Sequence, residues 1–291
     1  SNGGCDINYL TNNYQLYTHI EDSTNTVEVY IICNDGKKIF FPENSFNLFS
    51  SYNYLKQITF KNIDTSYVTD MTEMFYGCHN LTALDLSSFN TNNVTSMAEM
   101  FRYCEKLTTL NISNFNTSNV TNMNWMFSGC SNLTSLNVSR FNTDNVTSMA
   151  EMFEGCSNLT NLDVSNFNTS NVTSMSGMFS DCSNLTTLDL SIFDTSKVNS
   201  MSEMFSNCSN LTSLDLSNFN TSNVIDMNKM FAHCNNLTSL DVSTFKTYKV
   251  DQMVSMFEGC SSLTILDLSS FRDARYKINM FKDCINLKII Y

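Results

Sequence analysis

The feature that most constrains this chain is a repeat with a period of 26 residues. Cysteine marks it: from Cys78 to Cys260 the cysteines are spaced by 26 residues without exception, and Cys284 follows after 24. All 17 methionines, and one phenylalanine per unit, fall in the same register. A fixed period of roughly 20–50 residues indicates a solenoid, in which each unit packs on its neighbours. We therefore predict a solenoid of about nine to ten coils over residues 51–291.

Each unit contains the pattern of one short strand and one short helix. Residues 84–87 alternate apolar and polar side chains, which indicates a strand with one buried face. Met97, Met100 and Phe101 follow at the i, i+3, i+4 spacing of a helix about two turns long. The residue before the first methionine is a good N-cap in most units: Asp70, Ser96, Asn122, Ser148, Ser174, Ser200 and Asp226. The predicted fold class is α/β, with parallel strands ~4.8 Å apart in successive coils.

Residues 1–50 lie before the regular repeats and are predicted to form an N-terminal cap. Apolar residues in 27–31 and 39–41 flank Asn34-Asp35-Gly36, a strong signal for a β-hairpin. We expect this hairpin to cover the otherwise bare core of the first coil. At the other end, basic residues are expected to keep the last coil soluble: Arg272, Arg275, Lys277, Lys282 and Lys288.

The repeat resembles a known family. Residues 179–190 read Phe-x-x-Cys-x-x-Leu-x-x-Leu-x-Leu, and Asn-Thr-Ser-Asn-Val-Thr-x-Met occurs at 116–123 and 168–175. These motifs are similar to the 26-residue variant of BspA-type leucine-rich repeats, which occur in bacterial surface proteins and lipoproteins. The resemblance covers about residues 49–291. It implies a right-handed leucine-rich-repeat solenoid on the cell surface, of a kind often found in adhesins.

The cysteines of the repeat have two interpretations. They could form a metal array or a disulfide ladder, but each belongs to a different coil and none has a zinc-like spacing to another cysteine or histidine. We favour the second interpretation, in which cysteine is a small buried apolar residue that stacks on its equivalents. Cys5 and Cys33 lie outside the repeat, and either a bridge between them or lipidation of Cys5 is left open. No metal or cofactor is predicted.

A row of polar residues runs along the predicted strands, between the two apolar residues of each: Asp85, Asn111, Asn137, Asp163, Asp189, Asp215, Asp241 and Asp267. If the sheet face is open, this row attracts cations or a basic partner. The alternative is a solvated ladder whose side chains share hydrogen bonds between coils. A specific calcium site is disfavoured, because calcium needs about six to eight converging oxygens. Candidate binding residues are Asp163, Asp189, Asp215 and Asp241, with Arg140, Ile192 and Trp125, which replace the usual residues of the repeat.

Several functions are excluded or disfavoured by composition. A net charge of -12 repels nucleic acid and anionic membranes. No apolar run reaches the ~20 residues of a membrane span, so any export signal or anchor is expected outside these 291 residues. The three histidines, His19, His79 and His233, lie far apart in the sequence, and no catalytic motif accompanies them, so we predict no enzyme activity.

Two functional classes remain. The first is an extracellular, cell-surface binding module whose open sheet face holds a host or environmental protein or glycan. The second is a structural surface element in which solenoids assemble end to end. Oligomeric state and ligand identity are left open.

Overall fold

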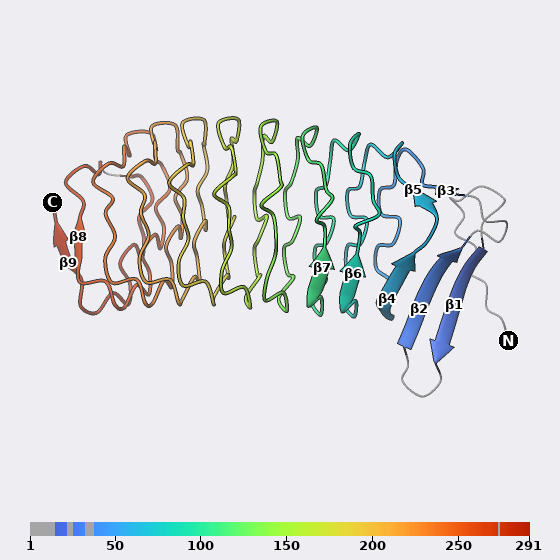
Figure 1. The fold of residues 1–291 in the computed structure, drawn as a ribbon. Coiled ribbons are helices and arrows are strands. Elements are labelled where there is room, and N and C mark those ends of the chain that lie inside the picture. The colour runs from blue at the N-terminus through green and yellow to red at the C-terminus, as the bar shows by residue number, and fades with distance from the viewer. Residues whose placement is uncertain (1–14, 22–25, 33–37, 273) are drawn as a thin grey trace.

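The chain forms a stack of coils that runs from the N-terminal strands to the C-terminus (Figure 1). The computed structural model describes residues 15–21, 26–32, 38–272 and 274–291. Its strands are β1 (Gln15–Glu21), β2 (Thr26–Ile32), β3 (Ile39–Phe40), β4 (Leu55–Phe60), β5 (Ile63–Asp64), β6 (Ala83–Asp85), β7 (Thr109–Asn111), β8 (Ile265–Asp267) and β9 (Lys288–Ile290). Buried side chains from successive coils form one continuous core along the stack. The solenoid expected from the 26-residue period is therefore present.

Strands pair in parallel between coils, but only towards the two ends of the stack. In β6 and β7, Leu84 pairs with Leu110, which is a shift of one repeat, and β8 pairs with β9 in the same way. Between β7 and β8 the equivalent segments form no strand, and the distance from the Thr212 nitrogen to the Thr186 oxygen is 3.5 Å. The prediction of a strand at residues 84–87 is thus confirmed for its first residues, while a paired strand in every coil is not found.

No helix occurs in the described part of the chain, so the predicted helix of each coil is wrong. The backbone turns into the left-handed region at Glu99 (φ 57°) and again at Tyr103 (φ 60°), which a right-handed helix cannot contain. The Glu99 N–H donates to the carbonyl of Asn124 in the next coil (2.8 Å). The Arg102 N–H donates within its own turn to the carbonyl of Glu99 (3.1 Å). Successive main-chain N–H groups therefore donate alternately to a carbonyl within their own turn and to a carbonyl of the next coil.

We call residues 96–103 and their equivalents in the other coils the inter-coil ladder. Isolated parallel bridges connect it from Asn44 to Tyr276 without a break: Asn44, Asp70, Ser96, Asn122, Ser148, Ser174, Ser200, Asp226, Gln252 and Tyr276. The residues expected as N-caps thus lie in these bridges. The side chain of Asn122 accepts the N–H of Asn124 (3.0 Å), a turn that uses the same residue types as an N-cap.

A buried threonine joins each coil to the next one on another side of the stack. Thr195 donates through Oγ1 to the carbonyl of Asn220 (3.1 Å) and accepts the Asn220 N–H (2.8 Å). Equivalent threonines donate to the next coil in the same way: Thr65, Thr91, Thr117, Thr143, Thr169 and Thr221. This explains why the threonine recurs in a segment that is otherwise variable and polar.

The core contains columns of identical residues. Stacked phenylalanine rings such as Phe101 and Phe127 have centroids 5.5 Å apart, and the other pairs of this column are similarly close. The prediction that the repeat cysteines are buried is confirmed for Cys78 to Cys260, and all nine cysteines from Cys78 to Cys284 are free. The Cys182 thiol donates to the carbonyl of Phe153 in the preceding coil (3.1 Å). Cysteine therefore fills a small apolar space and satisfies a buried acceptor at the same time.

The N-terminal region contains a hairpin, but its strands differ from those predicted. β1 pairs antiparallel with β2, and β2 continues in parallel onto β4, so the five-stranded sheet has the order β1-β2-β4-β6-β7. β3 pairs instead with β5 in a separate two-stranded sheet. The expected pairing of 27–31 with 39–41 is therefore wrong, because each segment has a better parallel partner in the first coil. Residues 34–36 lie outside the described residues.

The threonine column gives a test of stability. We expect Thr195→Val to lower the free energy of unfolding by about 1–3 kcal/mol, because valine keeps the shape but leaves the Asn220 main-chain groups without their buried partner. Thr187 is exposed, and Thr187→Val is the matched control with an expected change within about 0.5 kcal/mol. Equal denaturant midpoints for the two variants would contradict this role of Thr195.

The cysteine column gives a second test. Burial raises the pKa of Cys208 to about 12, and it also raises the pKa of the partly exposed Cys284. In a background with Cys5→Ser and Cys33→Ser, we expect a thiol reagent to modify Cys284 first and Cys208 only on unfolding. Peptide mapping of the labelled native protein is the measurement. Labelling of Cys208 as fast as Cys284 would show that the column is open.

Candidate functional site

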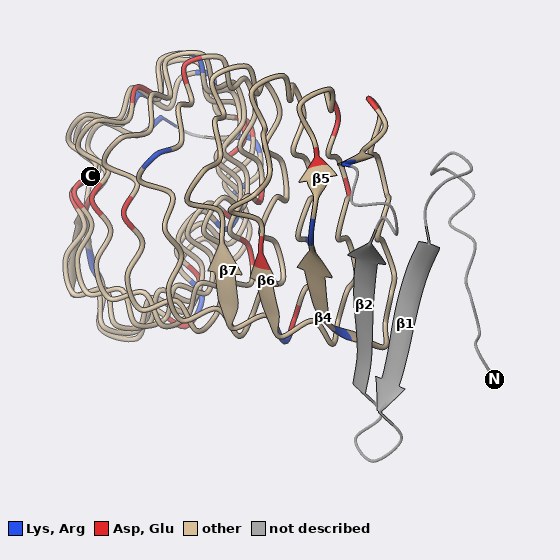
Figure 2. Ribbon diagram, turned by 45° about the vertical axis from the view of Figure 1, so that its right-hand side comes forward, with Lys and Arg blue, Asp and Glu red and all other residues tan. Residues whose placement is uncertain are grey.

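The row of acidic residues lies exposed along the middle coils, and we call the surface that carries Asp163, Asp189, Asp215 and Asp241 the strand face. Each carboxylate accepts the main-chain N–H of the serine two residues later, at 3.0 Å for Asp163 and Asp189. Asn111 and Asn137 make the same turn at 3.2 and 3.1 Å. The hydrogen bonds are thus formed within one coil, and the four carboxylates remain exposed in neighbouring coils. Figure 2 shows that most of the ribbon is tan, so charged residues are sparse along the stack.

These turns hold the row in its charged form. Hydrogen bonds from the backbone and side chain of Ser191 lower the pKa of Asp189, and they outweigh the repulsion from Asp163 and Asp215. Serine hydrogen bonds lower the pKa of Asp241 in the same way. The strand face therefore presents a line of negative charges at neutral pH, each fixed in direction by its own turn.

The other three candidate residues do not join this row into one site. Arg140 is exposed two residues after the buried Val138, and Ile192 is 47% exposed three residues after Asp189. Trp125 lies on the inter-coil ladder, where its φ is 55°. Arg140 and Ile192 therefore lie just beyond the strand segments of their coils. Trp125 lies on the ladder, which is a different side of the stack.

Trp125 belongs to a cluster of charged and aromatic side chains on the ladder. Its indole N–H donates to the carboxylate of Glu151 (2.6 Å). The Arg102 guanidinium lies 5.1 Å from the Trp125 ring centroid and 4.8 Å from that of Tyr103, and it also bonds Glu99 (2.9 Å). Trp125 is half-buried, and its one polar hydrogen is used within the chain. The cluster ties neighbouring coils together through side chains, in addition to the main-chain ladder.

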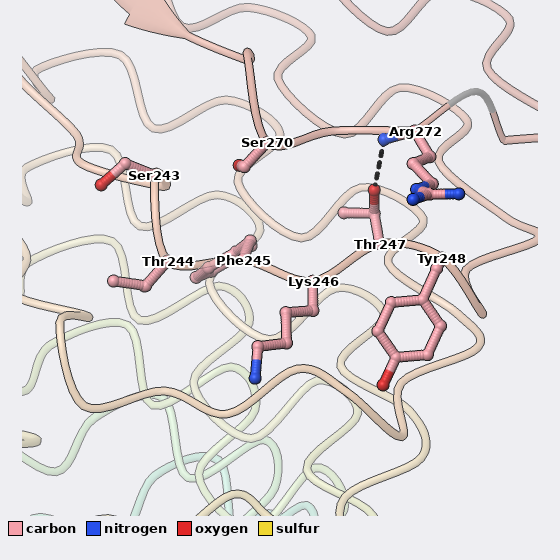
Figure 3. A pocket seen from close by; sticks show the side chains of 8 residues that line it. All are labelled: Ser243, Thr244, Phe245, Lys246, Thr247, Tyr248, Ser270 and Arg272. Carbon is pink, nitrogen blue, oxygen red and sulfur yellow. Dashed lines mark hydrogen bonds between the residues drawn. The ribbon is translucent and has the colours of Figure 1, made fainter.

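A pocket that the sequence reasoning did not identify lies close to the last coils. It has a volume of about 440 Å³ and is lined by Ser243, Thr244, Phe245, Lys246, Thr247, Tyr248, Ser270 and Arg272 (Figure 3). The Arg272 N–H donates to Thr247 Oγ1 (2.7 Å), which joins the two coils that form the pocket. The sequence carries a signal for it: Lys246 and Arg272 stand where the preceding coils have an acidic or amide residue.

The histidines and cysteines of the repeat are the remaining candidates for metal binding or reactivity. No group of three or more His, Cys, Asp or Glu side chains in the described ranges could hold a metal ion. Burial raises the pKa of the Cys78, Cys156 and Cys260 thiols to about 12, which leaves them protonated and unreactive at neutral pH. His79 and His233 belong to coils that are separated by several repeats.

The comparison with family models identifies the family. Residues 43–136, 108–192, 126–214 and 184–289 match the family described as "Mycoplasma protein of unknown function, DUF285". The overlapping matches together span residues 43–289, so this chain is a member of that family. Among curated proteins, none matches the chain.

Among the solved structures that are similar to this chain, two cover most of its length. One is a leucine-rich cell surface protein from Faecalibacterium prausnitzii, with 18% identity, a TM-score of 0.35, and coverage of 100% of this chain and 94% of that chain. The other is a leucine-rich repeat protein from T. pallidum, with 18% identity, a TM-score of 0.34, and coverage of 85% and 87%. Across the ranges that the structure describes, no helix is both long and apolar enough to span a membrane.

The Asp turns predict how stability changes in acid. A carboxyl with a lowered pKa stabilises the fold at pH values above 3.8, the ordinary value for Asp, and this contribution is lost as the pH falls below it. Asn keeps the turn without titrating, so Asp189→Asn with Asp215→Asn should lose less stability in acid than the parent.

Urea unfolding at neutral pH and at pH 3 measures this difference. Glu203→Gln with Asp251→Asn is the control, because it removes two acidic groups, Glu203 on the ladder and Asp251 directly before a ladder segment, and leaves the Asp row intact. Equal acid sensitivity of the parent and the row variant, with the control unchanged as well, would contradict a stabilising role for the turns.

Proposed function

We propose that this chain is a binding module of the bacterial cell surface that holds a polar or basic protein or glycan on its strand face. The observation that carries the proposal is the row Asp163, Asp189, Asp215 and Asp241, which is exposed, charged and in register on consecutive coils. A line of fixed charges on a rigid stack favours an extended partner with complementary positive charge.

The main chain of the strand face supports the same proposal. Between β7 and β8 the strand segments do not form a paired sheet, while the ladder holds the same coils together at every step. Among the described residues, the main-chain N–H groups of Asp163 and Asp189 donate no hydrogen bond, and we propose that they are available to a partner beside the carboxylates. A partner with its own hydrogen-bond donors and acceptors could bind these main-chain groups, whereas in a fully paired sheet they would already be bonded to the neighbouring strands.

The extracellular location rests on the sequence motifs. The repeat is similar to BspA-type repeats of bacterial surface proteins, and we propose that this family member shares their location and their role in adhesion. We further propose that residues 1–50 act as a cap for the solenoid of residues 51–291. The partner is expected to be a host or environmental macromolecule other than nucleic acid, because the net charge of -12 repels a phosphate backbone. We propose no catalytic role.

The strand-face proposal is tested by removing its charge without disturbing its turns. We expect Asp189→Asn with Asp215→Asn to weaken binding to members of a glycan and basic-peptide array by about tenfold, and the loss to shrink as salt rises. Asn makes the same turn at positions 111 and 137, so the variant should keep its fold and its unfolding midpoint at neutral pH.

The control is Glu203→Gln with Asp251→Asn, which changes the net charge by the same amount but at positions away from the Asp row. If every array member binds the row variant as well as it binds the parent, the strand face is not the binding surface. Light scattering over a range of concentrations tests the end-to-end alternative, since only self-assembly should increase the particle mass with concentration.

A further inference from the structure

One column of the solenoid changes its chemistry close to the C-terminal end. The residue before the buried threonine is acidic or an amide in seven consecutive coils: Asp64, Asn90, Asn116, Asn142, Asn168, Asp194 and Asn220. In the next two coils the same position is Lys246 and then Arg272. Both cations line the pocket of Figure 3.

This change removes a hydrogen bond that the other coils have. In each of the seven coils, the side-chain oxygen accepts the main-chain N–H two residues later, as Asn220 does from Ser222 (3.1 Å). Lys246 has no acceptor to offer. The Tyr248 N–H, which occupies the same position as the Ser222 N–H, has no hydrogen-bond acceptor among the described residues. The Tyr248 N–H is therefore left without the side-chain oxygen that accepts the equivalent N–H in the seven preceding coils.

Lys246 and Arg272 occupy equivalent positions in adjacent coils. The Lys246 N–H donates to Thr221 Oγ1 (2.7 Å) and the Arg272 N–H to Thr247 Oγ1 (2.7 Å), so the coils keep their normal contact at this column. Both side chains are exposed, and neither forms an ion pair within the described ranges. An oxyanion placed between them would gain two charge-assisted hydrogen bonds and the Tyr248 N–H.

The other half of the pocket is neutral and polar. Ser243, Thr244 and Ser270 supply hydroxyl groups, and the Tyr248 side chain is 54% exposed beside them. Asp241 lies two residues before Ser243 and accepts its N–H (2.9 Å), so the strand face places negative charge at this end. The pocket is therefore suited to a ligand with an anionic group at one end and uncharged hydroxyl groups at the other.

We propose that this pocket binds an anionic saccharide. Its carboxylate or sulfate lies between Lys246 and Arg272 and accepts the Tyr248 N–H, its ring packs on the Tyr248 side chain, and its hydroxyl groups bond Ser243 and Ser270. A polyanion such as a nucleic acid fits less well, because its charges would also meet Asp241. The site borders the strand face at Asp241, but it does not depend on the ligand proposed there.

The test measures binding of a sulfated disaccharide, a uronic-acid disaccharide, a neutral disaccharide and inorganic sulfate by calorimetry. We expect the two anionic sugars to bind and the neutral sugar to fail. Lys246→Asn with Arg272→Asn restores the residue type of the other coils. This variant should bind the anionic sugars at least about tenfold more weakly than the parent does. Tyr248→Ser introduces the residue type that most other coils have at this position. It should weaken binding of the anionic sugars and leave the affinity for inorganic sulfate unchanged.

The matched control is Lys106→Asn with Lys197→Asn, which removes two positive charges elsewhere and also restores the usual residue of the repeat. It should bind like the parent. The proposal is overturned if Lys246→Asn with Arg272→Asn binds the anionic sugars normally, or if the control is weakened as much. It is also overturned if the neutral sugar or a single-stranded oligonucleotide binds better than the anionic sugars, or if inorganic sulfate binds as well as they do.

Discussion

Every coil donates alternate main-chain N–H groups to the carbonyls of the next coil, and the rest of the structure depends on this exchange. The ladder requires left-handed backbone at two points of each coil, such as Glu99 and Tyr103. It also limits side chains, because a Cβ added to Gly129 would lie 2.7 Å from Tyr103 Cδ1, and one added to Gly177 would lie 2.7 Å from Glu151 Cγ. A large side chain in one coil is thus accommodated by a glycine in the next.

The sequence predicted the solenoid and its core, but not the conformation of the ladder. The 26-residue period and the buried columns follow directly from repeated apolar and cysteine positions. The spacing of Met97, Met100 and Phe101 also fits a pair of consecutive turns that bury the same three residues, so periodicity could not separate turns from a helix. Asx turns use the residue types of N-caps, which made the misleading pattern stronger. The hydrogen-bond partner in the next coil decides whether the segment forms turns or a helix, and no local sequence pattern shows that partner.

The sequence predicted the Asp row of the strand face but not the pocket near the last coils. The Asp row could be read from the sequence, and the exchange of Asp with Asn at positions 111 and 137 already indicates a turn that either side chain can make. The pocket was missed, although the replacement of Asn220 by Lys246 in the next coil marks it. Its shape depends on how two coils meet around Thr247 and Ser270, and this contact is visible only in three dimensions.

Hydrogen exchange resolved to single amides tests most directly whether the ladder holds the coils together. The account predicts slow exchange for the N–H groups of Glu99, Phe101 and their equivalents, which donate to the next coil. It predicts fast exchange for Leu162 and Asp163 on the strand face, which donate no hydrogen bond within the described residues. The account is contradicted if the strand face is protected in every coil while Glu99 and Phe101 exchange freely.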